Sequence, residues 1–339
     1  MATPEHAAPA APLLLAGALL LLALMGALAL GKFPVSPVEL AATLGARLLG
    51  DGTSADATRD AVIWHIRLPR VLAAALVGAA LGAAGAAYQG LFRNPLVSPD
   101  ILGVSAGCGL GAALAILLAL PLAAVSALAF AGGLLAVGVV LLAARRTGGH
   151  EAVLVLVLCG VAVGALLGAG IALVKLLADP SVQLPAITFW LLGGLGAVGL
   201  PDLRLAAPAL GLGATLLLAL RWRINLLSLP DEEAAALGVQ VGPLRLAVIA
   251  AATLMTAAAV AMAGIVGWVG LVVPHVARLL AGPEFSRLLP MALLLGAAFV
   301  VVADTLARTL APIELPLSVL SSAVGAPFFL WLLGRRSAR

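Results

Sequence analysis

The sequence predicts an all-α, polytopic membrane protein, a single bundle of about ten transmembrane helices. Of its 339 residues, 63% are apolar and only 10% are charged, whereas a soluble domain has about 25% charged residues. The mean hydropathy is +1.19. The apolar residues form long continuous runs instead of the alternation typical of a membrane β-barrel, so helices surrounded by lipid are the expected elements.

The amino-terminal half is expected to contain five spans. Its first apolar run lacks the basic start of a signal peptide and is long enough to cross a bilayer, so we expect a retained helix. A polar connection, residues 32–66, separates this helix from the second. The five spans are expected at about residues 13–30, 67–88, 101–118, 122–144 and 153–177.

The carboxy-terminal half is expected to contain five more spans, preceded by a short surface helix within residues 179–199. The run at 270–280 is too short for the roughly 30 Å of hydrocarbon. It should form a partial helix inside the bundle, where neighbours satisfy its backbone. The spans are expected at about residues 203–220, 244–266, 270–280, 288–307 and 317–333. No polar linker divides the chain, so we expect one membrane domain over residues 1–339.

The basic residues indicate topology and not a nucleic-acid partner. The net charge is +4, but the bases stand singly or in pairs at the ends of apolar runs. Cytoplasmic connections of membrane proteins are enriched in Lys and Arg. The Arg145-Arg146 pair, Arg221 with Arg223, and the basic tail therefore predict that both termini are cytoplasmic.

Glycines recur at every fourth position in two of the predicted helices. Such stripes of small residues let helix backbones approach closely. We therefore expect close helix packing at Gly103, Gly107 and Gly111, and at Gly160, Gly164 and Gly168.

Two motifs resemble catalytic sites but lack the required context. Residues 26–32 match the start of a phosphate-binding loop, but Phe33 stands where a magnesium-binding hydroxyl is needed. Ser105, between Gly103 and Gly107, matches a nucleophile elbow, with His275 as a conceivable base. An intramembrane serine hydrolase is therefore one alternative, although the elbow requires a strand before its helix.

The sequence predicts no metal site and no cofactor. Cys108 and Cys159 lie in apolar runs, without a Cys-x-x-Cys pattern or a Cys/His cluster. Two small buried side chains are the expected interpretation.

Charged residues near the ends of spans form a second group of candidates. Asp304 and Arg308 are four residues apart, so they share a helix face and can pair. A secondary transporter, the other alternative, needs acids within the membrane, and Asp304 is its only candidate. Arg67 and Arg70 have no acidic partner within a helical turn, so we expect them to bind lipid phosphate or the carboxylates of another protein.

Residues 228–238 predict a short helix in a cytoplasmic connection. Pro230 suits a first turn, Asp231, Glu232 and Glu233 favour the positive helix end, and Gly238 suits a stop. Because two turns are too short to be stable alone in water, the groove of a partner is expected to stabilise this helix.

Several distinctive strings follow one another along the chain: RLPR at 67–70, GAALGAAG at 78–85, NPLVSPDILGVSAG at 94–107, FWLLG at 189–193, EEAAALG at 232–238, GIVG at 264–267, GLVVPH at 270–275 and GAPFF at 325–329. Together and in this order they resemble the FecCD family, the membrane subunits of type II ABC importers for iron-siderophores, haem and cobalamin. The resemblance extends over nearly the whole chain. Departures are Pro230 where the family usually has Gly, Gly194 where Ser is common and Phe285 where His is frequent.

The resemblance implies a homodimer of ten-helix subunits in the inner membrane, with a substrate path along its two-fold axis. Two ATP-binding ABC subunits would supply the energy, so the chain itself would be a transport subunit and not an enzyme. A periplasmic or lipid-anchored binding protein would deliver the ligand.

The resemblance also implies roles for individual residues. Docking of the binding protein would involve Arg67, Arg70 and Arg308. The cytoplasmic gate would include Thr147, Gly148 and Gly149, and His275 would have a structural role. Coupling to the ATPase would involve Pro230, Asp231, Glu232, Glu233, Ala234, Leu237 and Gly238.

Overall fold

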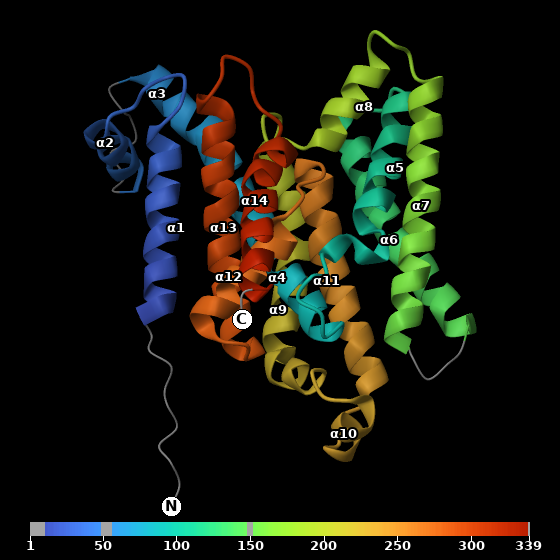
Figure 1. The fold of residues 1–339 in the computed structure, drawn as a ribbon. Coiled ribbons are helices and arrows are strands. Elements are labelled where there is room, and N and C mark those ends of the chain that lie inside the picture. The colour runs from blue at the N-terminus through green and yellow to red at the C-terminus, as the bar shows by residue number, and fades with distance from the viewer. Residues whose placement is uncertain (1–10, 49–55, 148–151, 338–339) are drawn as a thin grey trace, which may run out of the picture.

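The computed structural model describes residues 11–48, 56–147 and 152–337, and within these ranges it contains helices and no strand. The helices run roughly side by side in one bundle (Figure 1). We call the end of the bundle that carries α10 (Asp231–Ala236) the lower end, and the end that carries α8 (Gln183–Leu192) the upper end.

Seven helical stretches of the described chain are long and apolar enough to cross a membrane. One of them, residues 57–91, joins α3 (Ala57–Ala61), the π-helical turns η1 (Val62–Arg67) and α4 (Leu68–Leu91). The other six are α1 (Ala11–Ala29), α6 (Leu122–Thr147), α7 (Ala152–Leu177), α9 (Leu200–Leu226), α11 (Val241–Ala263) and α13 (Phe285–Thr309). All seven were predicted from their apolar runs.

The remaining three predicted spans correspond to the helices α5 (Val104–Leu117), α12 (Val269–Ala281) and α14 (Leu317–Ser337). The partial helix expected near residues 270–280 is confirmed, because α12 has only 13 residues. It begins after Trp268, whose φ of 67° lies in the left-handed region. The surface helix expected within residues 179–199 is α8.

Residues 32–66 were interpreted as a polar connection, but they contain α2 (Pro37–Leu48), and the second span begins within them at α3 and η1 instead of at residue 67. Ser36 and Glu39 form a capping box, in which the Ser36 N–H donates to Glu39 Oε2 at 2.9 Å and the Glu39 N–H donates to Ser36 Oγ at 3.3 Å. The Ser-x-x-Glu spacing was a sequence signal for this helix.

The centre of the bundle is α4, which packs against α13, α11 and α12. Its glycines allow backbone contact: a Cβ added at Gly78 would lie 2.0 Å from the carbonyl oxygen of Gly296, and one at Gly85 equally close to that of Gly270. The four-residue periodicity had marked other glycines for close packing, and Gly78 and Gly85 stood out only as part of the family string at 78–85. Dispersion contacts between close backbones take the place of large side chains here.

Some of the glycines in the predicted stripes lie in close contacts between helices. Added Cβ atoms would lie 2.4 Å from Gly132 O at Gly107 and 2.1 Å from Leu128 O at Gly111, so α5 packs closely on α6. At Gly160, a Cβ would lie 2.1 Å from the carbonyl oxygen of Ile101. An added Cβ at Gly103 would lie 3.6 Å from the Cα of Gly164, so these two glycines are in contact. Within the described chain, nothing beyond the neighbouring backbone of α7 lies within 4 Å of an added Cβ at Gly164 or Gly168, so the face to which those positions point is open.

Helices α5, α6, α7 and α8 form a group beside the central helices (Figure 1). The main neighbours of α7 are α5, α6 and the 3₁₀ turn η2 (Pro99–Leu102). In the most apolar stretch of α7 only 11% of the residues are buried, whereas in the corresponding stretch of residues 57–91 the share is 78%. Helix α7 is therefore peripheral in the single chain, and most of its surface is available to lipid or to another chain.

Candidate functional site

Arg67 lies at the upper end of the bundle, where its guanidinium binds the last turn of α1. Its Nη1 donates to the carbonyl oxygens of Leu28 at 2.5 Å and Ala29 at 2.9 Å, and Nη2 donates to that of Phe33. The last carbonyls of a helix have no partner within the helix, so a cation there is favourable. Arg67 is only 4% exposed, and these bonds account for its burial.

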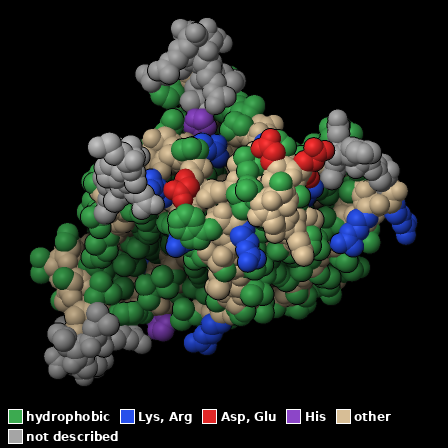
Figure 2. Space-filling view, turned by 90° about the horizontal axis from the view of Figure 1, so that it is seen from below, with side chains coloured by type: hydrophobic (Ala, Val, Ile, Leu, Met, Phe, Trp, Pro, Cys, Tyr) green, Lys and Arg blue, Asp and Glu red, His purple; other side chains and the backbone are tan. Residues whose placement is uncertain are grey.

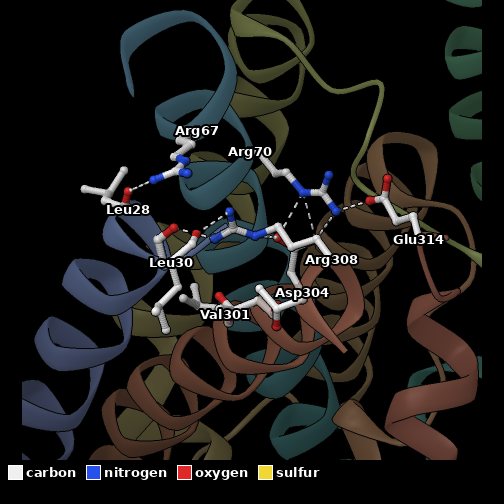
Figure 3. Close-up of polar contacts among 11 residues, drawn as sticks. Leu28, Leu30, Arg67, Arg70, Val301, Asp304, Arg308 and Glu314 are labelled. Carbon is white, nitrogen blue, oxygen red and sulfur yellow. Dashed lines mark hydrogen bonds and ion pairs between the residues drawn. The ribbon is translucent and has the colours of Figure 1, made fainter. Parts of the chain in front are cut away.

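Arg308 binds the same end of α1, close to Arg67: an added Cβ at Gly31 would lie 2.7 Å from Arg67 Nη2 and 3.1 Å from Arg308 Nη1. Its Nη1 donates to Leu30 O at 2.9 Å, its Nη2 donates to Ala27 O, and Nε lies 3.7 Å from Asp304 Oδ2. The predicted pairing of Asp304 with Arg308 is therefore confirmed. Figure 3 shows these contacts where α1, α4 and α13 meet.

Arg70 completes the cluster and corrects a prediction. Its Nε donates to both carboxylate oxygens of Asp304 at 3.0 Å, and its Nη2 donates to Asp304 Oδ1 at 2.8 Å and to Glu314 (Figure 3). Arg67 and Arg70 were expected to bind lipid phosphate or another protein because no acid lies within a helical turn of them, but both have partners within the chain. Their partners are backbone carbonyls of α1 and acids more than 230 residues away, which a search within one helical turn does not find.

Asp304 has a structural role, because both of its ion pairs are with arginines of the same chain. It is 1% exposed and is held between the guanidinium groups of Arg70 and Arg308. A carboxylate that is already paired with two cations has little capacity to coordinate a transported ion. The observation that supported a secondary transporter is therefore explained by the ion pairs.

A cavity of about 270 Å³ opens beside these arginines. Its polar lining consists of Lys32, the three arginines and Glu314. Within this cluster, the four cations exceed the two carboxylates of Glu314 and the adjoining Asp304 by two charges. The exposed Lys32 donates from Nζ to Pro312 O at 2.8 Å, which holds this cation at the rim.

The second candidate region is α10 at the lower end. As predicted, Pro230 precedes the helix, three acids occupy its first turn and Gly238, at φ +83°, follows its end. Ala234 is buried, whereas Glu232, Glu233 and Leu237 are exposed, Leu237 to 62%. Acidic side chains form a small patch on this end in Figure 2. The outer surface of α10 therefore presents acidic side chains and one leucine away from the bundle.

Asp231 faces the body of the protein. Its Oδ1 accepts from Arg93 Nη2 at 2.9 Å, and its two oxygens accept from Arg245 Nη2 at 3.0 and 2.8 Å. Partial burial opposes ionisation, but the hydrogen bonds and charges of Arg245 and Arg93 outweigh it and hold the Asp231 pKa below its ordinary value. Sequence reasoning missed both arginines, since neither is within one helical turn of Asp231 in the sequence.

A cavity of about 790 Å³ lies between α10 and α7. It is lined by Pro230, Asp231 and Glu232, by the connection that follows α4 and by the first turns of α7, including Val153 and Val157. Of the predicted gate residues, Thr147 ends α6, whereas Gly148 and Gly149 lie outside the described residues.

The geometry of Ser105 does not form a nucleophile elbow. Ser105 lies in the first turn of α5, which follows the 3₁₀ turn η2 and not a strand. Its hydroxyl donates to the carboxylate of Asp100, whereas the His275 ring contacts Phe328 edge-on, with centroids 6.5 Å apart. The hydrolase interpretation has no support in this arrangement.

Neither cysteine is in a disulfide: Cys108 is buried as expected, and Cys159 is only partly buried. Within the described ranges, no group of three His, Cys, Asp or Glu side chains is arranged to hold a metal ion.

Comparison with known proteins identifies relatives that match nearly the whole chain. The model of the FecCD transport family matches residues 19–335. A hemin transport system permease protein of Yersinia pestis is 40% identical over 337 residues, which cover 96% of both chains. A molybdate import system permease protein of Haemophilus influenzae is 37% identical over 322 residues, 94% of both chains.

A solved structure has the same fold over nearly the whole length. It is described as a metal-chelate type ABC transporter in an inward-facing conformation, and it is 35% identical to this chain. The TM-score is 0.86, with 95% of this chain and 98% of the other covered. This chain therefore belongs to the FecCD transport family and is a membrane-embedded ABC transporter permease.

Proposed function

We propose that this chain is the permease subunit of an ABC importer that carries a metal chelate across the inner membrane, powered by ATP hydrolysis in a separate subunit. The observation that carries the proposal is α10, a short helix fixed to the bundle through Asp231, with Glu232, Glu233 and Leu237 directed away from it. Such a helix is a ready docking element for a soluble partner. In this proposal the lower end is cytoplasmic, together with both termini.

The likeness to a hemin permease and to a metal-chelate type transporter supports iron-siderophore, haem or cobalamin as the substrate class. The molybdate relative shows that likeness of this degree also occurs with a smaller anion. The chemical selection of the substrate is then expected to lie largely in the binding protein that delivers it.

A homodimer supplies the path in this proposal. Helix α7 is the most exposed of the long helices described, and Gly164 and Gly168 leave its backbone open. Small residues on an exposed helix face allow close approach of a second helix. Two copies of the chain would meet near α7, with Thr147, Gly148 and Gly149 at the cytoplasmic gate between α6 and α7.

Replacing Glu232 and Glu233 together by Lys is expected to abolish stable association with the ATPase subunit. The change reverses two exposed charges without touching the Asp231 contacts, so the fold should persist. The measurement is copurification of the ATPase and substrate uptake into liposomes, with Glu284→Lys as the control, an acid of the same end paired with Arg287 at 3.2 Å. Uptake at the wild-type rate by the double variant would remove α10 from the coupling mechanism.

The binding protein is proposed to dock at the upper end beside Arg67, Arg70 and Arg308, where Lys32 is the exposed cation of the cluster. Because these arginines also hold α1 and Asp304, reversing their charges would disturb the fold. Lys32→Glu is the cleaner test, because Lys32 is exposed. It should weaken binding of the binding protein about fivefold at low salt, and this effect should shrink as salt screens the charges. Unchanged affinity at low salt in a titration with the binding protein would contradict this docking site.

A further inference from the structure

Arg93, two residues after the end of α4, has two features that distinguish it from other surface cations. Its φ of 50° lies in the left-handed region, which a side chain of this size seldom adopts unless its surroundings impose it. Its Nε donates to Leu227 O at 2.8 Å and its Nη2 donates to Asp231 Oδ1 at 2.9 Å. One guanidinium thus binds the end of α9 and the first residue of α10.

Arg245 binds the same carboxylate from α11 and is 9% exposed. The two arginines therefore connect α10 to different parts of the molecule. Arg245 anchors α10 to a helix of the central bundle. Arg93 connects α10 to the segment between α4 and α5, which continues through η2.

This segment reaches α7. The carbonyl oxygen of Ile101, in η2, lies against Gly160 of α7 so closely that an added Cβ would be 2.1 Å from it. The first turns of α7 are separated from α10 by the 790 Å³ cavity. The continuous contact from α10 to α7 therefore runs along the wall of this cavity, through Arg93 and the segment up to Ile101.

We propose that Arg93 is the positioning residue that transmits a displacement of α10 to α7. The inference rests on the proposed coupling role of α10. When the partner moves α10, the paired carboxylate of Asp231 moves the Arg93 guanidinium and the connection that follows it. The Ile101 carbonyl then shifts α7 at Gly160, while Arg245 keeps α10 attached to α11.

Three variants separate this role from a structural one. Arg93→Gly relieves the left-handed backbone and removes the guanidinium, so the fold should be retained. Arg93→Lys keeps the charge and one donor group. Arg287→Gln is the control, because Arg287 also forms an ion pair at this end of the bundle, with Glu284.

The first readout is the number of substrate molecules transported per ATP hydrolysed, in liposomes containing the whole importer. Arg93→Gly should lower this ratio about fivefold with unchanged ATPase association, as expected when a charge-assisted hydrogen bond is lost at a partly exposed site. Arg93→Lys should give an intermediate ratio, and Arg287→Gln the wild-type ratio. A wild-type ratio in Arg93→Gly overturns the proposal, and so does loss of ATPase association, which would make Arg93 a mere support for α10.

The second readout is the movement of α7 itself. Spin labels at Leu158→Cys on α7 and Val302→Cys on α13, both exposed positions, report their distance in a chain whose Cys108 and Cys159 are replaced by Ala. A non-hydrolysable ATP analogue should shift this distance in the otherwise wild-type importer and not in Arg93→Gly. The same shift in both overturns the proposal. Failure of the wild-type chain to bind any ATPase would instead refute the proposed function.

Discussion

Asp304→Asn is expected to destabilise the fold by about 3 to 5 kcal/mol, because it leaves buried cations without their shared counter-charge. Asn preserves the volume of the side chain, so the effect reports charge and not packing. Arg70 and Arg308 both depend on this carboxylate, and their side chains are only 13% and 12% exposed. The measurement is thermal or denaturant unfolding of the purified chain in detergent.

The ion pair of Glu39 with Arg59 supplies the control for this experiment. Its atoms lie 2.7 Å apart, but its side chains are 37% and 26% exposed. Glu39→Gln should therefore change stability by about 1 kcal/mol or less. Equal losses in the two variants would show that burial does not determine the strength of the Asp304 pairs.

Gly85→Val is expected to lower stability by about 3 kcal/mol, as overpacking does in a close-packed core. The new Cβ would lie 2.0 Å from the carbonyl oxygen of Gly270, and a backbone atom cannot move aside as a flexible side chain can. Helix α4 would have to separate from α12. The result should appear as a lower unfolding temperature and a broader profile in size-exclusion chromatography.

Gly138→Val is the matched variant, since it introduces the same β-branched side chain into the helix α6. Among the described residues, nothing beyond the neighbouring backbone of α6 lies within 4 Å of a Cβ added at Gly138. Its effect should be limited to the propensity difference, below about 1 kcal/mol. Comparable destabilisation by both variants would contradict the assignment of Gly85 to a backbone contact.

The helices could be predicted from the sequence because each apolar run has one low-energy arrangement in lipid. The same reasoning found α12 as a partial helix and the short helix at α10, where Pro230 and Gly238 mark the limits. It missed α2 because that helix is amphipathic and lies within a polar segment. Its capping box was visible, but hydropathy alone does not detect such a signal.

Individual residues of the candidate sites could be predicted from the sequence, but most of the contacts between those residues could not. Asp304 and Arg308 were paired from their spacing because both lie on one helix. Arg70 with Asp304, and Arg93 and Arg245 with Asp231, are separated by many residues, and their contacts depend on how the helices pack. The glycines showed the same limit: periodicity marked Gly164 and Gly168, but only tertiary structure shows that Gly78 and Gly85 bear the closest contacts.

The cluster at the end of α1 also bears on how the chain is made. Arg70 is synthesised 234 residues before Asp304, so the growing polypeptide carries this cation into the bilayer long before its counter-ion leaves the ribosome. Arg67, in contrast, finds its acceptors on the preceding helix, which has already been synthesised. The carbonyl oxygens at the end of α1 can therefore bind the Arg67 guanidinium early in membrane insertion. The ion pairs of this region form only after α13 has been synthesised and has packed against α4.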